Sequence, residues 1–130
     1  MPPRTHPAVA NQHYRNMELQ SRVASASPHG LVSLLYEELL HSLDLLAITV
    51  SRGQPISGNS HHVKAISIVI ALESSIDFAK GGNLAGVLQR IYRSAARSLN
   101  AAAQANDISE ITQVRSAISE IAYAWAALAK

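Results

Sequence analysis

The sequence predicts an all-α protein, an antiparallel up-down-up-down four-helix bundle preceded by a flexible N-terminal segment. Three observations support this fold class. Four stretches of roughly twenty residues repeat apolar side chains every three or four positions, as amphipathic helices do. Short breaks rich in Gly, Pro, Ser and Asn separate these stretches, so successive helices should run antiparallel. Ala, Leu, Ile and Ser make up much of a chain that is 48% hydrophobic and only 15% charged, a composition that favours helices.

The length and composition bound the organisation of the chain and its partners. A chain of 130 residues predicts one domain, with residues 27–130 as the bundle and residues 1–26 as a flexible tail. No cysteine is present, which fits a cytoplasmic protein, and no apolar run is long enough to insert into a membrane. A net charge of +2 is too small to predict a nucleic-acid partner. The low charged fraction indicates apolar surface outside the core that awaits a partner.

The first predicted helix begins at Ser27 and Pro28 and runs to about Ser51. Ser27 is suited to the N-cap, and Pro28 to the first helical position, where its missing N–H costs nothing. One broad arc of apolar residues, which includes Tyr36, should face the core. A second set of leucines falls beyond the polar strip, on another side of the same helix. This set, the leucine flank, consists of Leu31, Leu34 and Leu45.

The second predicted helix begins at Asn59 or Ser60 and reaches Phe78, and it too is apolar on two sides. One side carries Ile68 and Leu72 and should face the core. The opposite side, the isoleucine flank, consists of Val63, Ile66 and Ile70. Both flanks have two open explanations: they are core residues of a tightly wrapped bundle, or they form a groove for a foreign helix.

Two adjacent glycines, Gly81 and Gly82, are expected to end the second helix in a left-handed turn. Asp77 is expected to accept hydrogen bonds from the backbone N–H groups of this turn. The third helix then runs from Asn83 or Leu84 to about Ala105. The last follows a break at Asn106-Asp107, and its apolar seam consists of Ile111, Val114, Ile118, Ile121, Trp125 and Leu128.

The sequence offers no convincing catalytic or metal chemistry. The adjacent His61 and His62 point in different directions, and neither has a second ligand one helical turn away. The glycine corner lacks the Lys-Ser/Thr ending of a phosphate loop. An exposed basic stripe on the third helix has no interleaved aromatic residues. We therefore expect a protein without catalytic residue, metal or cofactor; the stripe consists of Arg90, Arg93 and Arg97.

Several motifs along the chain are typical of one bacterial family, and they occur in the family's order. They are an N-terminal Tyr, a Thr-Ala-Ser-Pro-like helix start, a Leu-Tyr-Asp-Gly motif, and Ser-Leu-Asp-Phe-x-x-Gly-Gly-x-Ile-Ala followed by Leu-x-x-Leu-Tyr. The matching residues here are Tyr14, Ser25-Ala26-Ser27-Pro28, Leu35-Tyr36-Glu37-Glu38, Ser75-Ile76-Asp77-Phe78, Gly81-Gly82, Leu84-Ala85, Leu88, Ile91-Tyr92, Ala105-Asn106-Asp107 and Trp125. Residues 14–128 thus resemble the flagellin-specific export chaperones called FliS. Glu38 stands where the family commonly has Gly, and Val87 where it often has Asn.

This resemblance implies a cytoplasmic chaperone that binds the C-terminal segment of flagellin, one copy to one copy, and docks to the flagellar export gate. It also implies that the N-terminal segment covers part of an apolar groove. Our hypothesis for the lid is Tyr14, Met17 and Leu19. Our hypothesis for the groove is Leu31, Leu34, Leu45, Val63, Ile66 and Ile70, with walls of Tyr36, Phe78, Leu84, Val87 and Leu88. The competing hypothesis is a structural bundle without a flagellin client that self-associates, as a homodimer, through the same apolar surface.

Overall fold

The computed structural model describes the backbone of residues 7–128 and the side chains of residues 11–128. Within that part the chain forms five α-helices and no strand. The all-α class is therefore confirmed, with one helix more than the sequence predicted. The helices are α1 (Pro7–Ser25), α2 (Pro28–Ser51), α3 (Ser60–Ser74), α4 (Phe78–Ala105) and α5 (Ile108–Ala127).

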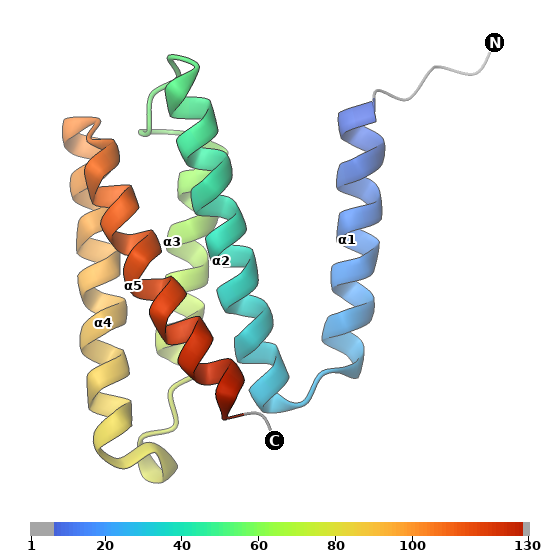
Figure 1. Cartoon of the computed structure of the whole chain (residues 1–130), viewed down its shortest axis with the longest axis vertical. Coiled ribbons are helices and arrows are strands. Elements are labelled where there is room, and N and C mark those ends of the chain that lie inside the picture. The colour runs from blue at the N-terminus through green and yellow to red at the C-terminus, as the bar shows by residue number, and fades with distance from the viewer. Residues whose placement is uncertain (1–6, 129–130) are drawn as a thin grey trace.

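Four of the helices pack together, and the first stands apart. Helix α2 packs against α3 and α5, and α4 packs against the same two helices from the other side. Figure 1 shows α1 beside α2, separated from the other four, and joined to α2 by a short link at the lower end of the view. The chain thus surrounds one core with α2–α5 and places α1 outside it.

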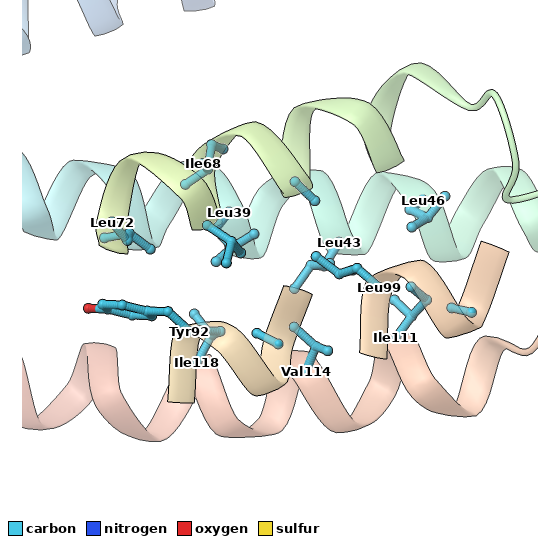
Figure 2. Packing of buried hydrophobic residues seen from close by; sticks show 14 of the residues in the cluster. Leu39, Leu43, Leu46, Ile68, Leu72, Tyr92, Leu99, Ile111, Val114 and Ile118 are labelled. Carbon is cyan, nitrogen blue, oxygen red and sulfur yellow. The ribbon is translucent and has the colours of Figure 1, made fainter. Parts of the chain in front are cut away.

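The core is a column of aliphatic side chains with one tyrosine pair. Figure 2 shows residues from α2, α3, α4 and α5 directed toward one another along this column. Burial of each large aliphatic side chain contributes about 1.5–3 kcal/mol to folding. The labelled members are Leu39, Leu43, Leu46, Ile68, Leu72, Tyr92, Leu99, Ile111, Val114 and Ile118.

The predicted helix starts of α2 and α3 are confirmed by their caps. The hydroxyl of Ser27 accepts a hydrogen bond from the Gly30 N–H at 3.0 Å. The amide oxygen of Asn59 accepts one from the His61 N–H at 2.9 Å. At the start of α5, Asp107 accepts from both the N–H and the hydroxyl of Ser109. Each cap satisfies a backbone donor that the first turn leaves free.

The predicted boundary between the second and third helices is wrong. Helix α3 ends at Ser74, and Phe78 begins α4. The cause is Asp77, whose carboxylate accepts hydrogen bonds from the Ala79 and Lys80 N–H groups, both at 3.1 Å, and so caps a new helix. Its partners are therefore not the N–H groups of the glycine turn. Gly82, with φ 52° and ψ −133°, interrupts α4 one turn later instead of ending α3.

Helix α1 is the element that sequence reasoning did not assign. The residues from Tyr14 to Val23 carry few apolar side chains, and an isolated helix of this length is marginal in water. Its side chains nevertheless reach α2, with Arg15 bonded to Glu38 and Arg22 to Glu37. Contact with another helix thus supports a segment whose own propensity is weak.

Candidate functional site

The leucine flank of α2 has one buried member, Leu34, on the side of α2 that α1 reaches. Leu34 is only 6% exposed, yet it does not belong to the cluster that fills the bundle. Leu34, Glu38, His41 and Leu45 follow one another at steps of three or four residues, so they form one stripe of α2. Arg15 of α1 bonds to Glu38 on this stripe, so α1 reaches the side of α2 on which Leu34 lies. Leu45 is half-buried and Leu31 is exposed.

Charged groups hold α1 to this stripe. One oxygen of Glu38 accepts a hydrogen bond from Arg15 at 2.6 Å, and the other accepts one from Lys64 of α3 at 3.0 Å. We call these three residues the Glu38 cluster. Burial, followed by the positive charge of Arg15, lowers the pKa of the neighbouring His41. The cluster therefore joins three helices at one carboxylate.

Only one of the three predicted lid residues faces inward. Leu19 is half-buried and lines the crevice between α1 and α2. Tyr14 and Met17 are 73% and 54% exposed. Tyr14 and Met17 therefore point outward in this arrangement of α1.

The isoleucine flank lies mostly in the open. Val63 and Ile70 are each 57% exposed and, seven residues apart, lie on one side of α3. Lys64 marks the edge of α3 toward α2, and Glu73, bonded to Arg93 at 2.7 Å, marks the edge toward α4. Ile66, by contrast, is half-buried and packs against the core. Val63 and Ile70 thus present apolar surface to solvent between these two edges.

A cavity of about 360 Å³ opens where the start of α2, the α3–α4 link and the end of α5 meet. Trp125 forms one wall, stacked on the His29 ring at 4.4 Å, and donates its indole N–H to the His29 carbonyl at 3.0 Å. Two predicted groove walls, Leu84 and Leu88, line this cavity. Other apolar lining residues are Val32, Ile76, Ala85 and Tyr92.

The remaining predicted walls do not join this cavity. Tyr36 is 1% exposed and lies in the interior, where its hydroxyl shares a hydrogen bond with that of Tyr92 at 2.5 Å. Phe78 is exposed outside the cavity lining, and Val87 borders a separate depression between α4 and α5. The predicted groove residues are thus spread over the stripe of α2 that α1 reaches, the open side of α3, the cavity and the interior.

The buried tyrosine pair predicts a loss of stability in alkali. Burial raises the pKa of both Tyr36 and Tyr92 above the ordinary value of 10.0. The folded state therefore retains protons that the unfolded state releases, so the contribution is complete below pH 10 and is lost as the pH rises further. We expect the free energy of unfolding to fall by roughly 1 kcal/mol per pH unit for each tyrosine. Urea titrations at several pH values would show this slope.

The matched control is the double variant Tyr36→Phe with Tyr92→Phe. It keeps the exposed tyrosines and removes only the buried pair, so it should lose that part of the slope. An unchanged slope in this variant would contradict the assignment of alkaline sensitivity to the pair.

Elsewhere in residues 7–128 the structure offers little further chemistry. No group of three or more His, Asp or Glu side chains is gathered there as a metal site. Over the same residues no helix combines the length and apolarity that crossing a membrane demands. The basic stripe on α4 is exposed, and Arg93 is engaged by Glu73.

Sequence reasoning missed two features of the surface, the Glu38 cluster and the Trp125 cavity. Arg15 and Arg22 are seven residues apart, so they lie on one side of a helix, the side that meets Glu38 and Glu37 of α2. That signal carries weight only once residues 7–25 are taken as a helix. The contact between His29 and Trp125 joins distant parts of the chain and has no local signal.

The described part of the chain thus defines a class: a helical bundle that leaves apolar side chains outside its core and carries a further helix, joined to α2 by two ion pairs. Comparison with known proteins then gives the family. Residues 10–130 match the family described as "Flagellar protein FliS". The chain belongs to this family.

Three curated relatives are similar in sequence to this chain over most of their length. The chain is 32% identical to the flagellar secretion chaperone FliS of Salmonella typhimurium, over 86% of this chain and 84% of the relative. It is 30% identical to the flagellar secretion chaperone FliSB of Pseudomonas aeruginosa, over 89% and 92%. It is 29% identical to the flagellar secretion chaperone FliS of Vibrio cholerae, over 88% of this chain and 84% of the relative.

Proposed function

We propose that this protein is a cytoplasmic, non-enzymatic flagellar secretion chaperone that binds the C-terminal segment of flagellin, one copy to one copy. The observation that carries the proposal is the exposed apolar side of α3, Val63 and Ile70, in a chain whose relatives are named secretion chaperones. An antiparallel up-down-up-down arrangement of α2–α5 would provide the rigid support for this surface.

The binding mode follows from the chemistry of such surfaces. An amphipathic helix of the client lays its apolar side along exposed apolar residues, which removes both surfaces from water. Val63, Ile70 and the exposed Leu31 are available without rearrangement. Leu34 is buried, so a client would reach it only after a rearrangement of the helices around it.

We assign four further residues to the contact with flagellin in the same proposal. The half-buried Leu45 and Ile66 border the two flanks, while Leu84 and Leu88 admit a client side chain into the Trp125 cavity. Flagellin bound to the chaperone would not polymerise before export, because its assembly surface is covered. The complex would then dock to the flagellar export gate.

Charged replacement on the open side of α3 tests this function. The double variant Val63→Glu with Ile70→Glu should weaken binding of a flagellin C-terminal peptide at least tenfold, because two carboxylates replace apolar contacts. Calorimetric titration of the full chain would measure the change. The helical circular dichroism and melting should remain close to those of the original chain, because both side chains are exposed.

The control is Tyr123→Glu, which places one carboxylate on α5, at a side chain that is 83% exposed. This variant should bind the peptide normally. Equal weakening by Tyr123→Glu, or unchanged affinity of the α3 variant, would contradict the proposed surface.

A second copy of the chain is the alternative occupant, since the same exposed Val63 and Ile70 would also suit a homodimer. Light scattering with and without the peptide separates the two. A chaperone takes up one peptide per chain, whereas a closed homodimer takes up none.

A further inference from the structure

The carboxylate of Glu38 is the most enclosed partner in the contact between α1 and the rest of the chain. Its side chain is 13% exposed, against 38% for Arg15 and 44% for Lys64. Each carboxylate oxygen has one cationic donor, Arg15 for one and Lys64 for the other. An enclosed carboxylate is costly unless such partners remain in place.

The second ion pair between α1 and α2 is more exposed than Glu38. Arg22 and Glu37 also join α1 to α2, at 2.8 Å, but their side chains are 48% and 56% exposed. Exposed ion pairs contribute little, because water screens both charges. The electrostatic attachment of α1 is therefore concentrated on Glu38, one helical turn from the buried Leu34.

We propose that Glu38 determines which helix occupies the side of α2 on which Glu38 and Leu34 lie. In the free protein that helix is α1, held through Arg15. When another helix replaces α1, Glu38 loses its hydrogen bond from Arg15. The replacing helix must therefore present its own Arg or Lys to the Glu38 carboxylate. This inference rests on the proposed function and specifies the chemistry of the client.

Helix α1 itself shows the pattern that such an occupant needs. Arg15 lies four residues before the half-buried Leu19, so the cation and the apolar side chain lie on one side of the helix. The cation meets Glu38 while the apolar residue lies in the crevice above α2. A client helix with a cation one turn before a leucine-like residue reproduces both contacts.

The first test concerns α1 alone and needs no client. Amide hydrogen exchange of the full chain should show α1 exchanging roughly three- to tenfold faster in Glu38→Gln, the effect of losing one charge-assisted attachment. Glu37→Gln, changed at the next position, should stay within about twofold of the original chain. Equal exchange in the two variants would overturn the role of Glu38.

The second test concerns the helix that replaces α1. Two flagellin C-terminal peptides are compared, the natural one and one in which Gln replaces every Arg and Lys. The original chain and Glu37→Gln should prefer the natural peptide roughly three- to tenfold, and Glu38→Gln should lose the preference. A preference retained in Glu38→Gln would overturn the charge requirement.

The two tests separate this inference from the function on which it rests. If neither peptide binds any variant, the proposed function fails, and the client requirement fails with it. Hydrogen exchange decides the attachment of α1 by Glu38 in either case.

Discussion

Replacing Leu43 with Ala lowers the free energy of unfolding by about 2–5 kcal/mol. Leu43 is fully buried in α2, in the middle of the cluster to which all four bundle helices contribute (Figure 2). The substitution removes apolar contacts and leaves a void that close-packed neighbours fill only in part. Since a domain of this size is stable by only about 5–15 kcal/mol, the loss is a large share of the total.

Urea denaturation followed by circular dichroism measures this change. Leu31→Ala provides the control, because it makes the same chemical change in the same helix at an exposed position. We expect it to cost less than about 1 kcal/mol. Equal losses at the two positions would show that the bundle core is not where the structure places it.

The second large effect is expected at the glycine corner. Gly82 has φ 52° and ψ −133°, a combination that is open to glycine and strained for a β-branched residue. Gly82→Val should therefore cost about 1–3 kcal/mol or shift the first turn of α4. Space is not the limitation, because a Cβ at this position meets no atom within 4 Å.

Gly86→Ala is the matched control for this prediction. Gly86 lies four residues further along α4, and the nearest atom to an added Cβ is the Arg90 guanidinium at 3.7 Å, an ordinary contact. An alanine there should stabilise the protein by about 0.5–1 kcal/mol, because it favours the helix. Thermal melting should show a lower melting temperature for Gly82→Val and a higher one for Gly86→Ala. A neutral Gly82→Val would contradict the conformation of the corner.

Local signals were enough to predict most of the bundle. Ser27, Pro28 and Asn59 cap helices where the sequence places them, because a cap depends on residues within one turn. The seam of α5 also holds for Ile111, Val114 and Ile118, which are buried. Periodicity and capping chemistry thus specify where these helices begin and which side they bury.

Sequence patterns did not predict two features, the boundary between α3 and α4 and the helix α1. At the glycine corner, Asp77 and Gly82 both offered a helix boundary, and the aspartate cap ended α3 first. In the N-terminal segment, α1 depends on Arg15 and Arg22 meeting acids on α2. Tertiary contacts of this kind override weak local propensity.

The candidate surface was predictable to a similar extent. A helix apolar on two sides is either enclosed on both or leaves one side outside the core. On this flank Val63 and Ile70 are exposed, whereas Ile66 packs against the core. Sequence reasoning could not show which neighbouring element buries Leu34, nor that the hydroxyl of the inward-facing Tyr36 pairs with that of Tyr92. The binding role of the predicted surface and lid residues stays a prediction.

The position of Trp125 gives this protein a built-in optical reporter. It is the single tryptophan of the chain, and its indole forms part of the cavity wall while stacked on His29. Indole emission changes colour and intensity with the polarity and quenching groups around the ring. A ligand side chain that enters the cavity therefore alters the emission spectrum of the unlabelled protein.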